Sequence, residues 1–332
     1  MNKISRLLFL SFILLFVNGR FLSPVYGQSR VNFEHLSIKD GLSMSAVTAV
    51  YQDSRGFMWF GTQDGLNRYD GYTFKKFFDD PLVPHTLSSK NIEDVSEMKI
   101  KGKRYLWIST KGGGLNRYDP ELERFESYQH DSSDSTSISA DDIQMLVPSG
   151  NGQLWIGTNT NIVDRYDPIE DVFHHYYYKE GETGSFYGYG VNDIFRDSRE
   201  RVWFATRGAT LDLYHAKADT FIHYFPPQPY RNYSINAIEE YQDKLYLANP
   251  EGIFTFDPAT EVFSAVTFDQ SRLPSEFNFI DIEIDTSGCL WAASSSNGLI
   301  RLNLSTGKVT AFASDPGLSA SLASNFIIDI EL

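Results

Sequence analysis

Residues 56–74, GFMWFGTQDGLNRYDGYTF, are followed by a close copy at residues 104–125, RYLWISTKGGGLNRYDPELERF. Both stretches contain W-x-x-T and then L-N-R-Y-D, and their tryptophans stand 48 residues apart. Repetition at a period of about 20 to 50 residues is typical of solenoid, propeller and array architectures. The repeat is therefore the first evidence on the fold.

The repeat extends along most of the chain. Around each anchor stand four short segments rich in Val, Ile, Phe, Tyr and Trp, separated by turns of Gly, Asn, Asp and Ser. This pattern predicts four strands of an antiparallel meander. The anchors are Trp59, Trp107, Trp155 and Trp203 at intervals of 48 residues, followed by two weaker copies at Leu245-Tyr246-Leu247 and Trp291.

The strand that holds the anchor is apolar on both of its faces, as Phe57 and Trp59 alternate with Met58 and Phe60. A strand buried on both faces lies between two layers, which stacked blades provide. The period and the four strands per copy predict an all-β fold, a β-propeller of four-stranded antiparallel blades. A helical solenoid would need a 3.6-residue pattern, which the repeats lack, and an up-and-down barrel would alternate apolar with polar residues.

The two ends of the chain do not complete the last copy. Six full copies cover about residues 44–315, and residues 32–43 align with the end of a copy, which predicts an outer fourth strand. Residues 324–332, SNFIIDIEL, align with the innermost strand of a seventh copy. The sequence thus predicts six complete blades plus an incomplete seventh, and we expect the chain to be a C-terminally truncated portion of a longer protein.

The first 27 residues have the layout of a secretory signal peptide. Lys3 and Arg6 precede the apolar run at 7–17, and small residues near Gly27 permit cleavage. The run has 11 residues, short of the roughly 20 needed to span a bilayer. We therefore predict a signal peptide at 1–27 and an exported propeller at 28–332, with an uncleaved anchor as the alternative for the first segment.

Composition excludes several classes of function. The net charge is −14, from 43 acidic and 29 basic residues, and such a surface repels phosphate backbones. Nucleic-acid binding by this region is therefore not expected. The single cysteine, Cys289, cannot form a disulfide within the chain, and no Cys/His spacing for zinc is present. We predict no cofactor and no metal site, including at His174-His175, which lacks an acidic cluster of ligand spacing.

The repeat units and the lead-in FEHLSIKDGLSMSAVTAVYQDSRG at 33–56 resemble two-component regulator propeller repeats. Together with the predicted signal peptide, the chain resembles the N-terminal periplasmic sensor region of hybrid two-component histidine kinases. The resemblance implies two propellers and a β-sandwich domain, followed by a transmembrane helix, kinase, receiver and DNA-binding domains. It also implies inner-membrane anchoring, a homodimeric full-length form, and detection of oligosaccharides released from polysaccharides. This chain lacks the phosphoacceptor His box and the ATP-site glycines, so kinase activity is not expected in it.

In a four-strand meander the strand 2–3 turns and the linkers to the next copy share one face of the ring. Amides, Arg and exposed Tyr on such loops suit a sugar, whose hydroxyls take bidentate hydrogen bonds and whose ring stacks on aromatics. The segment GSFYGYGVND at 184–193 is the most suggestive one. The alternative is a glycine-rich turn with packed tyrosines. The predicted ligand-binding residues are Gln63, Lys111, Asn159, Tyr187, Tyr189, Asn192 and Arg207.

Other repeated residues are expected to be structural. Asp53, Asp197 and Asp285 stand where the Asp-box turn of sialidase-type propellers has its aspartate, which caps backbone N–H groups. The repeated arginines Arg68, Arg117 and Arg165 are expected to pair with acids of neighbouring blades.

The functional hypothesis is a non-catalytic sensor portion of a two-component system, and no catalytic residues are predicted. No G-x-S-x-G, H-E-x-x-H or P-loop is present. Two alternatives remain, an exported propeller enzyme such as a lyase or glycosidase and a structural or protein-binding propeller. The enzyme would need carboxylates about 5 to 10 Å apart on one face.

Overall fold

The structure is a computed structural model that describes residues 31–182, 184–268 and 278–332. Residues 34–332 form one compact unit, and the description below is confined to it. The predicted signal peptide, residues 1–27, lies outside the described residues. No helix in the described part of the chain is long and apolar enough to cross a membrane.

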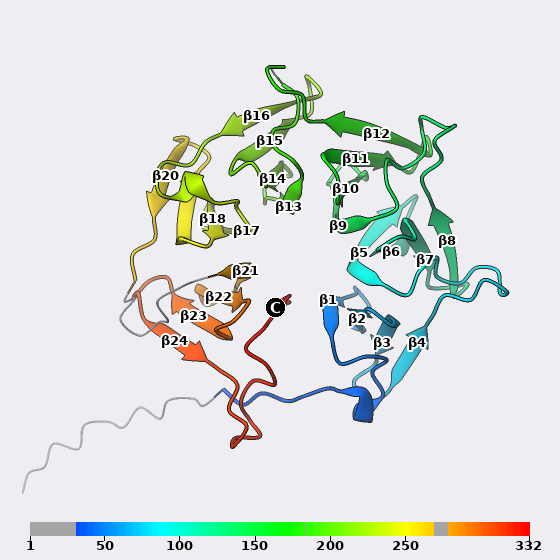
Figure 1. Ribbon diagram of the computed structural model, residues 1–332, viewed down its shortest axis with the longest axis horizontal. Coiled ribbons are helices and arrows are strands. Elements are labelled where there is room, and N and C mark those ends of the chain that lie inside the picture. Colours follow the sequence, from blue (N-terminus) through cyan, green and yellow to red (C-terminus); the bar gives the residue numbers. More distant parts are fainter. Residues whose placement is uncertain (1–30, 183, 269–277) are drawn as a thin grey trace, which may run out of the picture. The chain divides into compact units, whose positions relative to one another are not determined.

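The compact unit consists of six four-stranded antiparallel sheets, each built from four strands consecutive in sequence (Figure 1). Blade 1 contains β1 (Val47–Gln52), β2 (Met58–Thr62), β3 (Gly65–Tyr69) and β4 (Phe74–Phe77), and blade 2 contains β5 (Ile92–Ile100), β6 (Lys103–Thr110), β7 (Leu115–Asp119) and β8 (Arg124–Tyr128). Blade 3 contains β9 (Ile143–Pro148), β10 (Leu154–Thr158), β11 (Ile162–Asp167) and β12 (Val172–Tyr177), and blade 4 contains β13 (Val191–Arg196), β14 (Val202–Thr206), β15 (Leu211–His215) and β16 (Thr220–Tyr224). Blade 5 contains β17 (Ala237–Tyr241), β18 (Lys244–Asn249), β19 (Gly252–Asp257) and β20 (Val262–Ala265), and blade 6 contains β21 (Phe279–Ile284), β22 (Cys289–Ser294), β23 (Leu299–Asn303) and β24 (Val309–Phe312).

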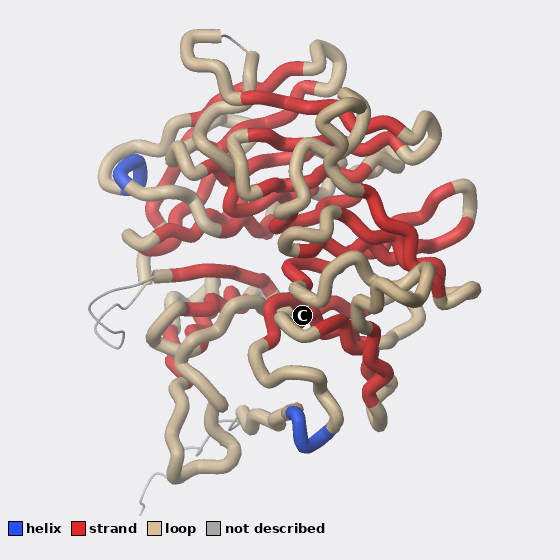
Figure 2. Tube along the Cα trace, turned by 45° about the vertical axis from the view of Figure 1, so that its right-hand side comes forward, coloured by secondary structure: helices blue, strands red, loops and turns tan. Residues whose placement is uncertain are grey.

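The six sheets form a ring, with the first strand of each at the centre and the fourth at the outside (Figure 1). The predicted all-β propeller with six complete blades is confirmed. The helical content of the described residues is two short 3-10 turns, η1 (Ile38–Asp40) and η2 (Tyr230–Asn232), as the two blue segments of Figure 2 indicate.

The predicted seventh blade is present only as extended backbone. Neither residues 32–43 nor residues 324–332 are assigned as strands, contrary to the prediction, because neither has a sheet neighbour with which to form a ladder. The C-terminal segment nevertheless occupies the gap between β21 and β1 (Figure 1). Ile327 N–H donates to the Ser294 carbonyl at 3.1 Å, and His35 Nε2 donates to the Ser321 carbonyl at 2.8 Å.

Aromatic contacts between neighbouring blades explain why the tryptophan and the L-N-R-Y-D tyrosine repeat together. Trp59 of blade 1 meets Tyr118 of blade 2 edge to face, with ring centroids 5.5 Å apart. The same contact recurs one blade further at Trp107–Tyr166 (5.3 Å), and again at Trp155–Tyr214 (4.6 Å). Trp59, Trp107, Trp155 and Trp203 are almost completely buried. Edge-to-face packing of this kind stabilises beyond its buried area.

The predicted role of the repeated arginines is confirmed for two of the three. Arg68 pairs with Glu123 of the next blade at 3.8 Å, and Arg165 pairs with Asp219 of the next blade at 3.4 Å. Arg117 instead pairs with Glu126, which lies on the last strand of its own blade, so the prediction is wrong there. The guanidinium of Arg117 also lies over the Tyr105 ring.

The Asp-box prediction is confirmed in three blades. Asp53 Oδ1 accepts the N–H groups of Arg55 (2.9 Å) and Phe57 (3.0 Å), and its Oδ2 accepts Trp59 Nε1–H at 2.9 Å. Asp197 and Asp285 make the equivalent bonds to the loop and tryptophan of their blades. One carboxylate thus joins the strand 1–2 turn to the buried anchor.

A second set of aspartates joins the inner edges of the blades. In each case one carboxylate oxygen accepts a backbone N–H from the next inner strand around the ring or from the C-terminal segment. Leu146 N–H donates to Asp94 Oδ2 at 2.7 Å, Ile238 N–H to Asp193 Oδ2 at 2.7 Å, Ile330 N–H to Asp281 Oδ2 at 2.9 Å, and Val50 N–H to Asp329 Oδ2 at 2.6 Å. The last two bonds hold the C-terminal segment between blades 6 and 1.

The inner strands also gather carboxyl groups whose pKa values are raised. Burial is the main cause in every case, and it raises the pKa of Asp94 and Asp193 to about 7. Burial and the neighbouring Glu283 raise the pKa of Glu239 to about 8, and burial with Glu331 raises that of Glu283 to about 7. These groups therefore hold protons at pH values where ordinary carboxyls are ionised.

We expect Asp53→Ala to destabilise the propeller by roughly 3 kcal/mol, because it leaves two backbone N–H groups and a buried indole N–H without an acceptor. Urea unfolding followed by tryptophan fluorescence measures the change. Asp53→Asn keeps one acceptor oxygen and should lie between the wild type and the alanine variant. Equal stability of Asp53→Ala and the wild type would contradict the role assigned to this carboxylate.

We also expect the free energy of unfolding to fall as the pH rises from about 5 to 8. A carboxyl whose folded pKa is raised contributes stability below its unfolded pKa and loses it as the pH rises through the folded value. The folded values of Asp94, Asp193, Glu239 and Glu283 lie at about 7 to 8. Urea midpoints at pH 5 and pH 8 test this, and Glu239→Gln should reduce the slope. Stability that rises over this range would contradict the assignment.

Candidate functional site

The strand 2–3 turns owe their shape to the threonine of W-x-x-T. Each threonine is completely buried and bonds across its own turn. Thr62 Oγ1–H donates to the Gly65 carbonyl (2.8 Å), and Thr110 Oγ1–H to the Gly114 carbonyl (2.7 Å). Thr158 Oγ1–H likewise donates to the Ile162 carbonyl at 2.7 Å. The turn residues that follow each threonine are therefore held in a similar place on every blade.

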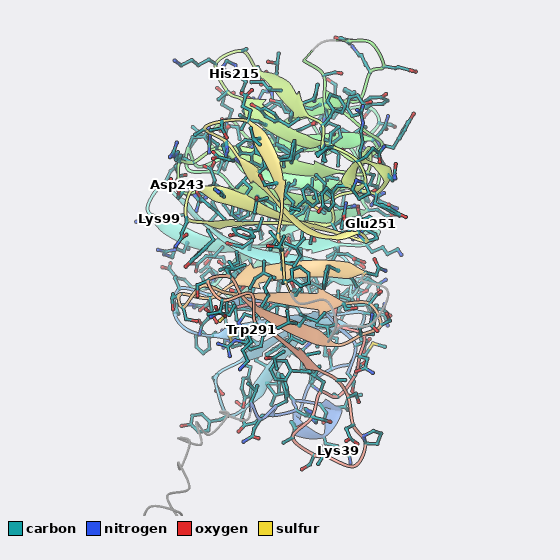
Figure 3. All side chains as sticks on the ribbon, turned by 90° about the vertical axis from the view of Figure 1, so that its left-hand side faces the viewer. Lys39, Lys99, His215, Asp243, Glu251 and Trp291 are labelled. Atoms are coloured by element: carbon teal, nitrogen blue, oxygen red, sulfur yellow. The ribbon has the colours of Figure 1, made fainter. Side chains whose placement is uncertain are left out.

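The turns and the linkers lie on one face, as predicted. The backbone N–H of Lys111 donates to the Asn91 carbonyl, that of Asn159 to the Asp142 carbonyl, and that of Arg207 to the Gly190 carbonyl, at 2.9 to 3.1 Å. Figure 3 shows Glu251, from a strand 2–3 turn, on one side of the ring. Asp243, from a strand 1–2 turn, and Lys99 and His215, near the ends of β5 and β15 that lead into the other turns, lie on the opposite side.

Lys111 and Asn159 border a common recess between blades 2 and 3. The recess has a volume of about 90 Å³ and is also lined by Glu93, Asp142 and Gln144. Burial raises the pKa of Glu93, Lys111 lowers it, and Asp142 raises it further. A recess of this size holds a hydroxyl or hydroxymethyl group rather than a whole sugar ring.

Arg207 and Asn192 continue this polar strip onto blade 4. Arg207 Nη2–H donates to Gln144 Oε1 at 2.7 Å, and its Nε–H donates to Asn192 Oδ1 at 3.2 Å. Asn192 Nδ2–H donates in turn to the Ile235 carbonyl (3.0 Å) and to Asn236 Oδ1 (3.3 Å). Gln144 therefore links the recess of Lys111 and Asn159 to the Arg207 side chain.

Tyr187 and Tyr189 lie beside the strip in an exposed aromatic cluster. The ring of Tyr178 contacts both, with centroids 5.7 Å from Tyr187 and 5.2 Å from Tyr189. Tyr187 also contacts Phe225 at 5.2 Å, and Tyr189 is 70% exposed. Exposed aromatics grouped in this way commonly mark a binding surface.

The glycines that follow each of these tyrosines are required by close packing. Gly188 has φ 106°, and a Cβ there would stand 2.9 Å from the Gly208 nitrogen. Gly190 has φ 132°, and a Cβ there would stand 3.0 Å from the Thr160 carbonyl oxygen. Because side chains at these two positions would push the linker away from the strand 2–3 turns, the glycines bring Tyr187 and Tyr189 close to Arg207.

Gln63 is not brought into this group. It is exposed in the turn of blade 1, next to the surface ion pair of Asp64 with Lys90 (3.1 Å), and it lines neither the recess nor the tyrosine cluster. Six of the seven predicted residues therefore lie on blades 2 to 4. Ligand binding by the seven residues stays a prediction.

Three residues of this candidate site were not predicted from the sequence, namely Glu93, Gln144 and Tyr178. Glu93 and Gln144 stand at the same repeat position as Asn192, beside the bulge where each inner strand begins. A strict alignment of the repeats on this bulge would have identified both. Tyr178 ends the apparent outer strand VFHHYYY, and nothing in that pattern indicates that it turns toward Tyr187.

The outer-strand histidine His175 bonds to an aspartate of the neighbouring strand, and the described residues contain no group of three or more His, Cys, Asp or Glu that could hold a metal ion. His175 Nδ1 is 2.7 Å from Asp164 Oδ1, and the other oxygen of Asp164 accepts the Ser139 N–H at 2.8 Å. The hydrogen bond that His175 donates to the Asp164 carboxylate raises the pKa of His175. This pair joins the outer strand to the preceding linker.

Comparison with known proteins supports the resemblance. The family model described as two component regulator propeller matches residues 41–64. The chain carries a two-component regulator propeller repeat. A 49-residue stretch, 15% of the chain, is 47% identical to Histidine kinase P4 of Formosa agariphila and covers 4% of that kinase.

Solved structures agree on the propeller fold. The extracellular domain of BT3049 of B. thetaiotaomicron, described as a hybrid two component system, matches 91% of this chain with TM-score 0.75 and 21% identity. The corresponding domain of BT4673 matches 90% with TM-score 0.71 and 20% identity. This chain spans 39% and 37% of those two chains. An inactive virginiamycin B lyase from Staphylococcus aureus, solved with quinupristin, matches 80% with TM-score 0.58 and 13% identity.

Proposed function

We propose that this propeller is a non-catalytic, exported sensor module of a two-component system, and that it detects an oligosaccharide on the strand 2–3 face of blades 2 to 4. The observation that carries the proposal is the polar strip Lys111–Gln144–Arg207–Asn192 beside the exposed tyrosine cluster. Amides and a guanidinium match vicinal hydroxyls, and an exposed tyrosine matches the apolar face of a pyranose ring.

The two-component role is supported by the repeat at residues 41–64 and by the likeness of the fold to extracellular domains of such systems. In this role the propeller acts in the periplasm, joined to further sensor and kinase portions that transmit the signal. Those portions are the partners that the proposal requires, together with a homodimeric arrangement of the full-length receptor. The signal would regulate genes for using the polysaccharide from which the ligand comes.

One observation favours a catalytic alternative. Glu93 and Asp142 line the same recess, and burial raises the pKa of Glu93. A carboxyl with a raised pKa beside a second carboxyl is the arrangement that a glycosidase or lyase needs. The likeness to virginiamycin B lyase shows only that the fold is compatible with catalysis.

We expect calorimetric titration with a panel of oligosaccharides, neutral and acidic, to reveal saturable binding without turnover. Tyr189→Ala and Arg207→Ala should each weaken that binding by about tenfold, because each removes a contact group of the ligand. Tyr72→Ala, an 89% exposed tyrosine in a strand 3–4 turn, is the matched control and should leave it unchanged.

The outcomes separate the candidate functions. Product formation that is lost in Glu93→Gln would establish the enzyme instead of the sensor. Absence of heat with every glycan in the panel would exclude the carbohydrate sensor and leave a protein-binding propeller.

A further inference from the structure

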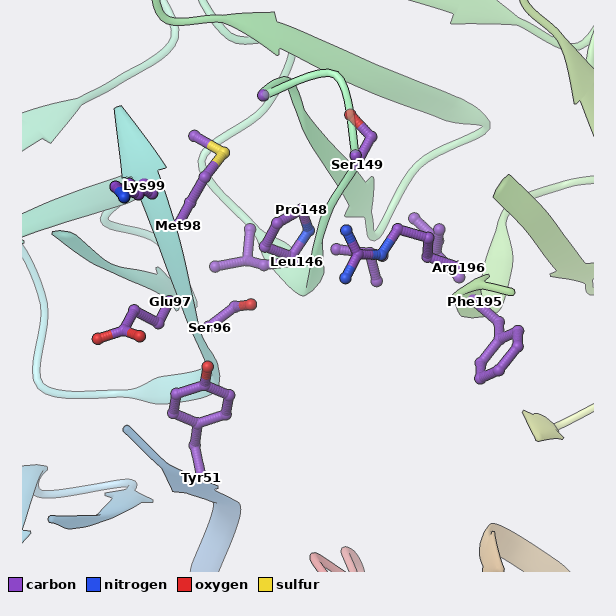
Figure 4. Close-up of a pocket in the computed structure, with 14 residues that line it drawn as sticks. Tyr51, Ser96, Glu97, Met98, Lys99, Leu146, Pro148, Ser149, Phe195 and Arg196 are labelled. Carbon is purple, nitrogen blue, oxygen red and sulfur yellow. The ribbon is translucent and has the colours of Figure 1, made fainter. Parts of the chain in front are cut away.

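A second cavity opens at the other end of the inner strands, on the face opposite the polar strip. It has a volume of about 520 Å³ and is lined by β1, β5, β9 and β13 together with the strand 1–2 turn of blade 3 (Figure 4). Pockets for small organic molecules typically have volumes of about 300 to 1,000 Å³. The cavity is therefore large enough for a ring-sized ligand.

One wall of the cavity is apolar. Met98 and Pro148 contribute side chains to it, whereas the Phe195 ring points away from them and packs toward blade 5 (Figure 4). The innermost strands elsewhere carry Glu239, Glu283 or Glu331 at the repeat position of Phe195. The other strands around the cavity carry Tyr51, Ser96 and Val147 at this position, so this sector of the inner edge lacks the carboxyl groups of the acidic sector.

Two hydroxyl groups reach the cavity from neighbouring inner strands. Ser96 is 8% exposed, and its hydroxyl makes no hydrogen bond among the described residues. Figure 4 shows this hydroxyl directed toward the open centre, with the Tyr51 hydroxyl close below it. Burial raises the pKa of Tyr51 to about 12, so its hydroxyl stays protonated and can donate. A hydroxyl that faces an open cavity is available to a polar atom of a ligand.

Positive charge is available at the cavity in spite of the acidic character of the chain. Arg196 directs its guanidinium across the cavity toward Pro148 (Figure 4). It gives one N–H to Glu200 at 3.3 Å, which leaves most of its five donors for other acceptors. The carboxylate of Glu97 is already occupied by Arg104 at 2.7 Å and by the Ser54 hydroxyl at 3.0 Å.

We propose that this cavity binds a small organic anion, a carboxylate attached to an aromatic or branched apolar body. The carboxylate pairs with the free donors of Arg196, the Ser96 hydroxyl donates to the same group, and the apolar body packs on Met98 and Pro148. Guanidinium groups bind planar carboxylates with two parallel hydrogen bonds, and the apolar wall supplies the remaining affinity. This site is independent of the proposed glycan surface on the opposite face.

Phenylacetate is the probe that tests the proposal, with phenylacetamide as its neutral counterpart and phenethylamine as its cationic one. Titration of the purified protein, followed by calorimetry and by saturation-transfer NMR, should show binding in the order phenylacetate, phenylacetamide, phenethylamine. Arg196→Gln should weaken phenylacetate binding about tenfold, and Ser96→Ala about threefold. Arg199→Gln is the matched control, because Arg199 lies on the adjacent turn and pairs with Asp243 at 2.9 Å.

Three results would overturn the proposal. They are the absence of binding by all three probes, a preference for phenethylamine, and phenylacetate binding that Arg196→Gln leaves unchanged. Because Arg196 is a partly exposed surface residue, the variant is expected to fold, and unchanged urea unfolding verifies this. Glycan titration of the same variants distinguishes the two sites, since Arg196→Gln should not affect oligosaccharide binding and Arg207→Ala should not affect phenylacetate binding.

Discussion

The structure depends on one contact between neighbouring blades, in which a buried tryptophan on the second strand meets the third-strand tyrosine of the next blade. Trp59–Tyr118, Trp107–Tyr166 and Trp155–Tyr214 repeat this contact with centroids 4.6 to 5.5 Å apart. In blade 5 a phenylalanine takes the place of the tyrosine, and Trp203 meets Phe256 at 5.8 Å. Since each sheet buries its apolar face only against the next one, the sequence must repeat both residues at the same period. The position of every loop on the two faces then follows from this stacking.

The fold was predictable from the sequence because the aromatic residues of the stacking contact recur at a regular interval. The aspartates of the Asp-box bonds, Asp53, Asp197 and Asp285, recur in the same way. The candidate site was only partly predictable. Lys111, Asn159 and Arg207 could be placed because they follow the turn-forming threonine, whereas Tyr178 could not, because its orientation depends on packing with Tyr187. Gln63 was predicted from its turn position alone, and that position does not indicate which blades carry neighbouring polar groups. Repeat position also fails to predict the surroundings of Trp107. Its blade has a longer hairpin without the Asp box, and its Nε1–H has no acceptor among the described residues.

The two candidate sites lie at opposite ends of the same inner strands. Gln144 lies near the start of β9 beside Arg207, and Pro148 ends the same strand in the wall of the second cavity. The corresponding pair on β13 is Asn192 near its start and Arg196 at its end. Strands so short are held rigidly by their ladders and by the carboxylate bonds between blades, so each face keeps its geometry without contact with the other. This separation explains how one repeat can carry amides and tyrosines on one face and an apolar wall with a guanidinium on the other.

The aspartates on the inner edge accept N–H groups from the next blade, and their placement limits the repulsion between their carboxylates. Blades 2, 4 and 6 carry Asp94, Asp193 and Asp281, whereas blades 1, 3 and 5 have Ala49, Met145 and Ala237 at the same repeat position. Each carboxylate therefore reaches the next blade without a second carboxylate beside it. The C-terminal segment interrupts the alternation, because Asp329 follows Asp281 directly around the ring and lies between it and Ala49. Burial together with Asp329 raises the pKa of Asp281 well above its ordinary value, while burial raises that of Asp329 to about 6. Because the raised pKa values reduce the ionised fraction of both carboxyls, the repulsion between them falls, while each still accepts the N–H group that joins blade 6, the C-terminal segment and blade 1.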